Sequence, residues 1–512
     1  MLLAATTART QQVAGLSTLT ALPKKILTRV VGKLKVDEEY SAHVNLDLEK
    51  KYDVPLHQIF SRTGHIDKRL AGDAMVMPCY KENLPFLGAT SGQMEASRLS
   101  NGVTTVSVDN SSPVVHLGVY LGVGTGNETR ANAGSLQVMK NAWLGSTTRR
   151  TLIGGHREPL QCGANIEFNV GRDITSITAS CPRDKASLVL DHMTQNLVCP
   201  EFFNHELHQA KVDALHQTGV ALSDPATIVM EEANRLAYRG TGLGRSIYLK
   251  AGNTGAIERN TLLDFAAENF KDSNNIAVVG VGLDPENLSG LADEYLWSLE
   301  GGSATVANTT WTGMQESQIE ASGNGALAMC LVEGAAAGSQ DALVLGILKH
   351  LAGAGGSAIT HGGSHSQLIS AAAPYTQSPF NTQCVNINNV NTGMFGLSIS
   401  AAGQEIGDVL KSSYGVMIGL NDGVSDQALE TAKNKLKLEL LSAYESNLAV
   451  RAATGLESIA AGSPSSASQL CGAIDSITNE EVIEAAKKIN SSAPILVSYG
   501  NVESMPLQRE LQ

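Results

Sequence analysis

The pattern of hydrophobic and polar positions repeats along this chain at a distance of about 220 residues. Residues 261–281, TLLDFAAENFKDSNNIAVVGV, have apolar positions at helical spacing and then a continuous apolar run. Residues 480–500, EEVIEAAKKINSSAPILVSYG, repeat this order, with Ala266 on Ala485 at an offset of 219. Both copies therefore predict a helix that leads into a buried strand.

Two further segments repeat in the same order. ELHQAKVDAL at 206–215 matches ALETAKNKLK at 428–437, and ITSITAS at 174–180 matches MFGLSIS at 394–400. Ordered matches at a nearly constant offset indicate a duplicated domain, because the repeat unit of a solenoid is far shorter. We therefore expect two homologous halves.

The mixture of hairpins and helices predicts an α+β fold, in which each half has an antiparallel or mixed sheet with helices packed on one face. The stretch over 301–318 is rich in Gly, Ser, Thr and Asn and has little periodicity, which is typical of a linker. We expect the first half over residues 93–300 and the second over residues 319–512.

Within the first half, Asn101-Gly102 favours a tight turn inside a hairpin over 98–109. Residues 114–124 are apolar nearly throughout, which predicts a strand buried on both faces. The other expected elements are a helix over 131–144, a strand pair over 165–180, helices over 185–197, 204–222 and 224–238 with an exit loop over 239–244, and, in the second half, a strand at ALAMCLVEG and a helix over 341–353.

The amino terminus differs in charge from the rest of the chain. Residues 1–36 contain six Lys or Arg and no acidic residue, so the remainder carries −19 within a total of −13. A basic, Ser/Thr-rich, acid-free leader is typical of a mitochondrial transit peptide, and a plain basic tail is the alternative. Residues 37–92 mix acidic and basic residues without an amphipathic period, and we expect an extension that lies along a partner or stays mobile.

Composition excludes several classes of function. The acidic body offers no basic stripe to replace phosphate counterions, which argues against a nucleic-acid partner. The seven cysteines are scattered and none forms a C-x-x-C pair, which favours reduced thiols over a disulfide framework. The sequence contains no run of 18 apolar residues, so it predicts no membrane-spanning helix.

Several segments resemble peptidase family M16, the pitrilysin family, and in particular its two-lobed mitochondrial members. LSNGVTTVSVDN at 99–110 is similar to the family's opening hairpin, and LAYRGTGLGRSIY at 236–248 is similar to its helix-exit motif. HLAGAGGSAITHGGSHSQLISAAA at 350–373 is similar to the Gly-rich segment of the second lobe. AKNKLKLELLSAYES at 432–446 and AAKKINSSAPILVSYGNV at 485–502 resemble the non-catalytic core subunits of respiratory complex III. The resemblance covers about 415 of the 512 residues.

The resemblance implies that an active member carries an inverted zinc motif, H-x-x-E-H, on the first helix of the first half. The two His bind Zn²⁺ and the Glu activates the bound water. With Trp143–Ser146 as the anchor, the three positions fall on Leu136, Met139 and Lys140, which supply neither suitable ligands nor a base. No His or Glu lies between 131 and 148, so a shifted alignment does not restore the motif. We expect no catalytic residue, metal site or cofactor.

Other histidines could form a displaced metal site. Three of them lie with Glu206 on the helix expected over 204–222, namely His205, His208 and His216. The absence of Cys or carboxylate partners at ligand spacing favours a hydrated helix face instead. His361 and His365 lie four residues apart in a Gly/Ser-rich loop without helical geometry, which makes a metal site there less favourable still.

Glycine motifs offer weaker alternatives. IAVVGVG at 276–282 lacks the third Gly of a dinucleotide-binding turn, and GTGLG at 240–244 follows a helix rather than a strand, so both favour plain turns. The Gly-rich stretch over 353–363 resembles a loop with which the non-catalytic subunit of the mitochondrial processing peptidase handles presequences. Its glycines are fewer here and are interrupted at 359–361, which favours the respiratory group.

The resemblance implies a non-catalytic subunit of complex III on the matrix side of the mitochondrial inner membrane. Its implied partners are a homologous core 1 or processing-peptidase β subunit and the cytochrome b, cytochrome c1 and Rieske subunits, with membrane contact only through these partners. The alternative is a processing-peptidase α subunit that binds presequences for a zinc-bearing β subunit, or one protein with both roles. A free-standing peptidase with an unusual site is a third, weaker hypothesis.

Overall fold

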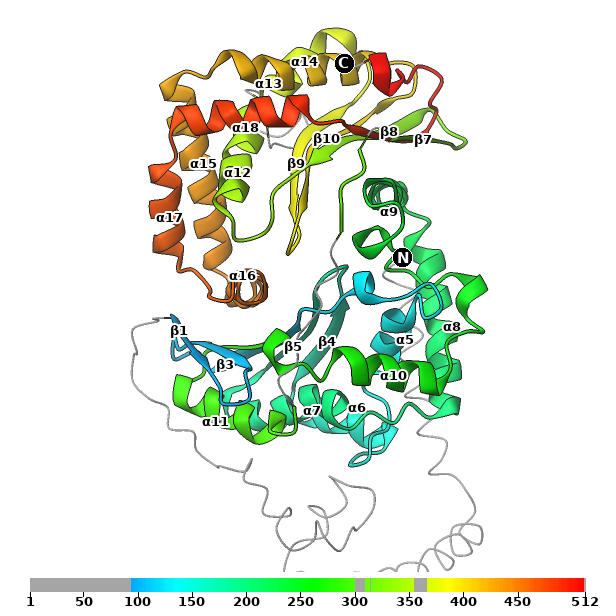
Figure 1. Ribbon diagram of the computed structural model, residues 1–512, viewed down its shortest axis with the longest axis vertical. Helices are drawn as coiled ribbons and strands as arrows, with labels where there is room; N and C mark the ends of the chain where they lie inside the picture. Colours follow the sequence, from blue (N-terminus) through cyan, green and yellow to red (C-terminus); the bar gives the residue numbers. More distant parts are fainter. Residues whose placement is uncertain (1–93, 300–308, 314, 354–365, 511–512) are drawn as a thin grey trace, which may run out of the picture. The chain divides into compact units, whose positions relative to one another are not determined.

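The computed structural model describes residues 94–299, 309–313, 315–353 and 366–510 (Figure 1). The first half is built on a six-stranded sheet. Its strands, in order across the sheet, are β1 (Met94–Arg98), β2 (Thr104–Val108), β6 (Ile276–Val281), β3 (Val114–Leu121), β5 (Thr175–Pro182) and β4 (Asn165–Val170). β2 and β6 are parallel, and the other neighbouring strands are antiparallel.

The second half repeats this order in a five-stranded sheet, without a counterpart of β1. Its strands are β7 (Gln315–Glu320), β11 (Ile495–Gly500), β8 (Gly325–Glu333), β10 (Gly393–Ala402) and β9 (Asn381–Asn388). β7 and β11 are the parallel pair, as β2 and β6 are in the first half. The repeated strands β6 and β11 begin at Ile276 and Ile495, at the offset seen in the sequence. The two homologous α+β halves with mixed sheets are therefore confirmed.

Helices cover one face of each sheet. In the first half they are α5 (Ser135–Ala142), α6 (Leu152–Gln161), α7 (Ala186–Val198), α8 (Asn204–Ala221), α10 (Arg259–Asn269) and α11 (Pro285–Leu296), of which α7 and α11 lie along the sheet in Figure 1. In the second half they are α12 (Gln340–Ala352), α13 (Gln367–Ala372), α14 (Ile406–Gly419), α15 (Asp426–Tyr444), α17 (Ala467–Ser476) and α18 (Asn479–Ser491). Alternate side chains of the strands, such as Leu117 and Val119 of β3, are fully buried beneath them.

One helix of each half packs on the other face of the opposite sheet. α9 (Pro225–Ala237) lies against β8 and β11, where Val229 and Leu236 contact apolar side chains of the second half. α16 (Asn447–Ala460) lies against β3 and β6, where Val450 packs with Tyr120. The two helices begin 222 residues apart, so they are copies of one element. This exchange explains why β3 is buried on both faces, as the sequence predicts.

Local sequence signals set several boundaries. Gly102 adopts a positive φ of 97° in the β1–β2 hairpin, where Asn101 Oδ1 accepts from the Val103 amide at 3.1 Å. Asp224 caps α9 by accepting from Thr227 N at 3.1 Å, and Pro225 follows at the first helical position. The helix expected over 131–144 is shorter, since α5 begins at Ser135 after the left-handed Gly134.

Some expectations concern residues outside the described ranges. These are the transit peptide at 1–36, the extension at 37–92, and the loop that carries His361 and His365. Half of the expected linker, residues 301–308 and 314, also lies outside them. β7 begins at Gln315, so its first four residues belong to the stretch expected to link the halves. None of the helices described is long and apolar enough to span a membrane.

Candidate functional site

The three positions at which the resemblance places a zinc motif all lie on α5, and they have different surroundings. Leu136 and Met139 are fully buried in the core of the first half. Lys140 is exposed near the end of the helix. Neither buried side chain has a donor of the kind that Zn²⁺ binds, and an ammonium group repels the ion. The side chains at these positions thus serve packing and solvation.

Polar contacts hold α5 against α8. Gln137 Nε2 donates to the Ala214 carbonyl at 3.3 Å, and its Oε1 accepts from the Leu249 amide. Asn141 Nδ2 donates to the Ala210 carbonyl at 3.2 Å. Gln217 Nε2 donates to Asn141 Oδ1 at 3.0 Å. The amide side chains of Gln137, Asn141 and Gln217 therefore form these polar contacts of α5.

Glu128 fixes the start of α5. Its two carboxylate oxygens accept from the amides of Gly134 at 2.8 Å and Leu136 at 2.9 Å, and the residue is only 3% exposed. Burial raises the pKa of Glu128 to about 7, although both backbone hydrogen bonds and the charge of Arg245 oppose the rise. The carboxylate replaces the missing hydrogen-bond partners of the first turn.

The histidines of α8 do not converge on one point. His205, His208 and His216 are all exposed, and His205 stacks on Phe203 with ring centroids 5.9 Å apart. Glu206 is buried and accepts from the Ser146 amide at 3.0 Å, so its carboxylate supports the turn after α5. In the described part of the chain, no group of three or more His, Cys, Asp or Glu side chains could hold a metal ion. The contacts favour the hydrated-face interpretation.

A buried ionic cluster lies behind α6, and sequence reasoning missed it. Arg150 Nε donates to Glu158 Oε2 at 3.0 Å, and its Nη2 donates to Asp191 Oδ2 at 2.6 Å. His192 Nε2 lies 2.9 Å from the same Glu158 oxygen. Burial lowers the pKa of His192, although the hydrogen bond to Glu158 opposes this, so neutral His192 acts as the donor at neutral pH.

No spacing rule could have found this cluster, because up to 41 residues separate its hydrogen-bonded members. α6 itself also escaped prediction, since Gly154, Gly155 and Pro159 weaken its helical signal. Thr151, whose side chain accepts from the Gly154 amide at 3.3 Å, was the available start signal.

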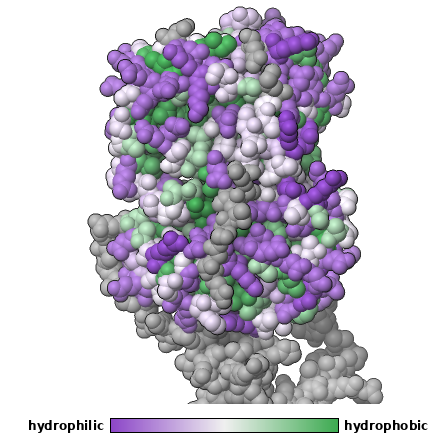
Figure 2. Space-filling view, viewed as in Figure 1, coloured by the Kyte–Doolittle hydropathy of each residue, from purple (hydrophilic) through white to green (hydrophobic). Residues whose placement is uncertain are grey.

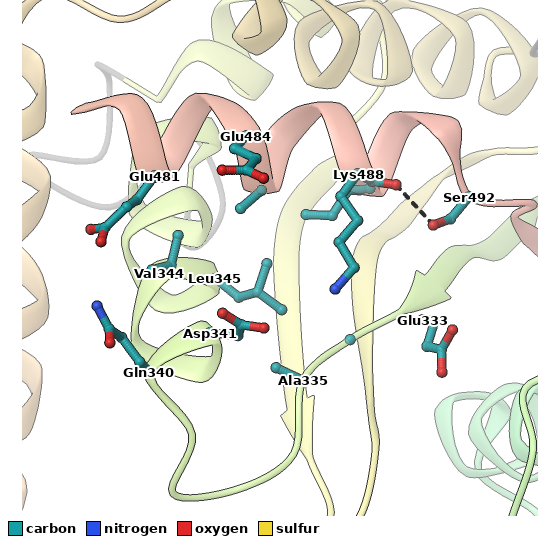
Figure 3. Close-up of a pocket in the computed structure, with 13 residues that line it drawn as sticks. Glu333, Ala335, Gln340, Asp341, Val344, Leu345, Glu481, Glu484, Lys488 and Ser492 are labelled. Atoms are coloured by element: carbon teal, nitrogen blue, oxygen red, sulfur yellow. Dashed lines mark hydrogen bonds between the residues drawn. The ribbon is translucent and has the colours of Figure 1, made fainter. Parts of the chain in front are cut away.

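A pocket of about 470 Å³ opens in the second half between the end of β8 and helices α12 and α18 (Figure 3). Four carboxylates line it, from Glu333, Asp341, Glu481 and Glu484, together with one ammonium group, from Lys488. In Figure 3 the Lys488 side chain extends from α18 toward the strand side of the pocket. The excess of carboxylates suits a cationic ligand group.

The two Gly motifs lie in turns. Gly282 follows β6 with φ of 90° and donates its amide to the Val108 carbonyl at 2.8 Å, and Asp284 then caps α11. Gly242 and Gly244 belong to a short 3-10 turn after α9.

Comparison with protein families agrees with this architecture. The family model described as insulinase (peptidase family M16) matches residues 104–250, and the model described as peptidase M16 inactive domain matches residues 256–436. Together these ranges span more than half of the chain. The chain belongs to peptidase family M16.

Several proteins with mitochondrial names are similar to most of this chain. The chain is 27% identical over 422 residues to cytochrome b-c1 complex subunit 2 of Homo sapiens. The aligned region covers 82% of this chain and 92% of that relative. It is 24% identical over 422 residues to mitochondrial-processing peptidase subunit alpha-2 of Dictyostelium discoideum, with coverages of 82% and 94%. The α subunit of the same peptidase from Solanum tuberosum is 22% identical, with coverages of 80% and 83%. Both groups named by the sequence resemblance are thus present among the relatives.

Proposed function

We propose that this chain is a non-catalytic, core 2-like subunit of mitochondrial complex III, the ubiquinol–cytochrome c reductase. It would lie on the matrix side of the inner membrane, where it would help to assemble and support the complex. The observation that carries the proposal is the burial of Leu136 and Met139 at motif positions of α5, in a chain whose relatives include cytochrome b-c1 complex subunit 2.

The chemistry of α5 supports a structural role. Hydrolysis by a zinc peptidase needs a metal with an open coordination position and a base beside the bound water. Leu136 and Met139 instead contribute to the core, so the helix stabilises the first half. The partners would be a homologous core 1 or processing-peptidase β subunit, together with cytochrome b, cytochrome c1 and the Rieske protein. Hemes and the iron–sulfur cluster would belong to those other subunits.

Native electrophoresis tests this role. Mitochondria would be solubilised gently, and the tagged full-length chain would be followed alongside the heme signal of cytochrome b. We expect the chain to co-migrate with the heme. Recovery only as a heme-free matrix heterodimer would contradict the respiratory role.

We also propose that residues 1–36 are removed on import and that residues 37–92 remain as an extension of the mature chain. Their charge difference supports this boundary. Amino-terminal sequencing of the protein from mitochondria would test it, and a mature chain that still begins at Met1 would contradict it.

The second candidate is the α subunit of a processing peptidase. The acidic pocket between β8, α12 and α18 favours it, because presequences are basic. A fluorescent presequence peptide would be titrated into the full chain and into the Glu481→Gln/Glu484→Gln variant. Tenfold weaker binding by the variant, together with processing after addition of a zinc-bearing β subunit, would support this role. Equal binding by both proteins would contradict it.

A further inference from the structure

The outer face of α6 carries exposed apolar side chains together with basic groups. Ile153 is 74% exposed, Leu160 is 76% exposed and Leu152 is 40% exposed. With His156, Arg157 and Gln161 these residues line a shallow hollow of about 650 Å³, which we call the α6 surface. Hydrophilic side chains cover most of the face shown in Figure 2, with hydrophobic areas between them.

This exposure is built into the helix. Residues 152, 156 and 160 are spaced four apart and share one face of α6. On the inner side, Glu158 is held by Arg150 and His192 in the buried ionic cluster. A Cβ added to the inner Gly155 would lie 2.7 Å from the Leu144 carbonyl oxygen, so the helix sits close to the body there. Rotation of α6 to bury Leu160 would break these contacts and expose Glu158. The fold of this chain therefore leaves the apolar face of α6 exposed, which is typical of an interaction surface.

The charge of the α6 surface narrows the choice of occupant. Arg157 is exposed and forms no ion pair in the described part of the chain. With its amide oxygen turned toward the guanidinium, Gln161 accepts from Arg157 Nε at 2.9 Å, which leaves the charge uncompensated. Arg149 lies just before α6 and is 50% exposed at its side chain, but its Nη1 is 3.8 Å from Asp191 Oδ1, so the unpaired charge is that of Arg157. A carboxylate on the occupant would complement this local positive charge.

An anionic membrane would also offer negative charge, but it fits less well. The chain beyond residue 36 has a net charge of −19, which opposes approach of the body to anionic lipid headgroups. Three aliphatic side chains on one short helix also offer little area for insertion into a bilayer. A second copy of this chain placed α6 to α6 would bring two Arg157 charges into one contact, and the single carboxylate of α6, Glu158, is buried and could not pair with them.

We propose that the α6 surface docks a neighbouring protein subunit that presents apolar side chains and a carboxylate opposite Arg157. This inference rests on the proposed function in one respect: the neighbouring subunit belongs to the same complex as this chain. The aliphatic side chains would form the dry centre of the contact, and the Arg157–carboxylate pair would set its register.

The test uses the full-length chain expressed in place of the native one. Leu160→Glu disrupts the apolar part of the α6 surface, and Arg157→Glu reverses its charge. Arg157→Lys keeps the positive charge. Leu438→Glu is the matched control, because Leu438 is 67% exposed on α15 and lies in the other half. Thermal unfolding of each purified chain verifies that it folds. Native electrophoresis then measures the fraction of chain in its high-mass complex.

We expect at least a tenfold loss of complex for Leu160→Glu and Arg157→Glu, and little change for Arg157→Lys and Leu438→Glu. Incorporation of Leu160→Glu at the wild-type level would overturn the proposal. If the wild-type complex lacks heme, the respiratory role fails, whereas loss of that complex in Leu160→Glu still supports the docking surface.

A photo-crosslinker at position 160 identifies the occupant. An adduct with a subunit of the same complex, at a segment that contains Asp or Glu, supports the proposal. An adduct with lipid, or with a second copy of this chain, overturns it.

Discussion

Tyr120 of β3 donates its hydroxyl hydrogen to the main-chain oxygen of Arg451 on α16 at 3.1 Å, so one side chain ties the first half to the second. The ring of Tyr120 also lies against Gly455, where an added Cβ would come within 2.2 Å of Cε2. α16 can approach the sheet this closely because Gly455 has no side chain. The contact of α16 with the first sheet therefore depends on a glycine in the middle of a helix.

We expect Gly455→Ala to destabilise the protein by about 1–3 kcal/mol, because the new methyl group must displace the buried Tyr120 ring. Chemical denaturation of the purified chain would measure this. Gly472→Ala is the control, since Gly472 lies inside α17 with open space around its Cα. That change should stabilise the chain by about 0.5–1 kcal/mol through helix propensity. Equal effects of the two variants would show that the Tyr120 contact is not close.

Glu158→Gln should destabilise the first half by about 3–5 kcal/mol, because it removes one of the two buried carboxylates that face buried Arg150. Asp475→Asn, in the exposed pair with Lys437, should cost about 0–1 kcal/mol. Both values can be measured by urea unfolding at neutral pH. A loss for Glu158→Gln no larger than that for Asp475→Asn would mean that water reaches the cluster.

Glu128 should make stability depend on pH. Burial raises the pKa of Glu128 from 4.5 to about 7, so the folded state holds this proton more tightly than the unfolded state does. Its contribution therefore becomes less favourable as pH rises from about 4.5 to about 7 and is constant above that range.

Glu128→Gln removes this titration but also places an amide donor against the α5 amides, so it lowers stability overall. The stability advantage of the wild type over the variant should shrink by about 2 kcal/mol between pH 5 and pH 7.5. Unfolding curves at several pH values would measure the difference, and a constant difference would contradict the raised pKa.

We expect the purified chain to contain no stoichiometric zinc, because the α5 positions hold Leu136, Met139 and Lys140. Elemental analysis would test this, with an active M16 peptidase as the positive control. Replacement of His205 and His208 by Ala should leave the metal content unchanged, since both side chains are exposed on α8. Bound zinc that disappears in this double variant would support the displaced site.

Much of the fold could be predicted because its information is local. The match of Ala266 with Ala485 identified a helix and the following strand in both halves, and the structure has α10–β6 and α18–β11 there. Asp224-Pro225 and Asn101-Gly102 marked a helix start and a turn through their own backbone preferences. Contacts between distant residues leave no comparable local pattern in the sequence. It was therefore not possible to predict the Arg150–Asp191 pair, or which face of α6 points inward and which outward.

The sequence by itself determined the duplication and the α+β class, because periodicity and turn residues are properties of short segments. Leu136, Met139 and Lys140 were assigned to the zinc-motif positions through the family resemblance. Only the tertiary structure decided that α9 and α16 exchange between the sheets and that Glu128 caps α5. It also decided that α6 keeps Leu160 exposed. These features depend on which distant surfaces pack together. Burial of apolar surface drives such packing but has no direction, so a single segment of the chain does not specify the surface against which it packs.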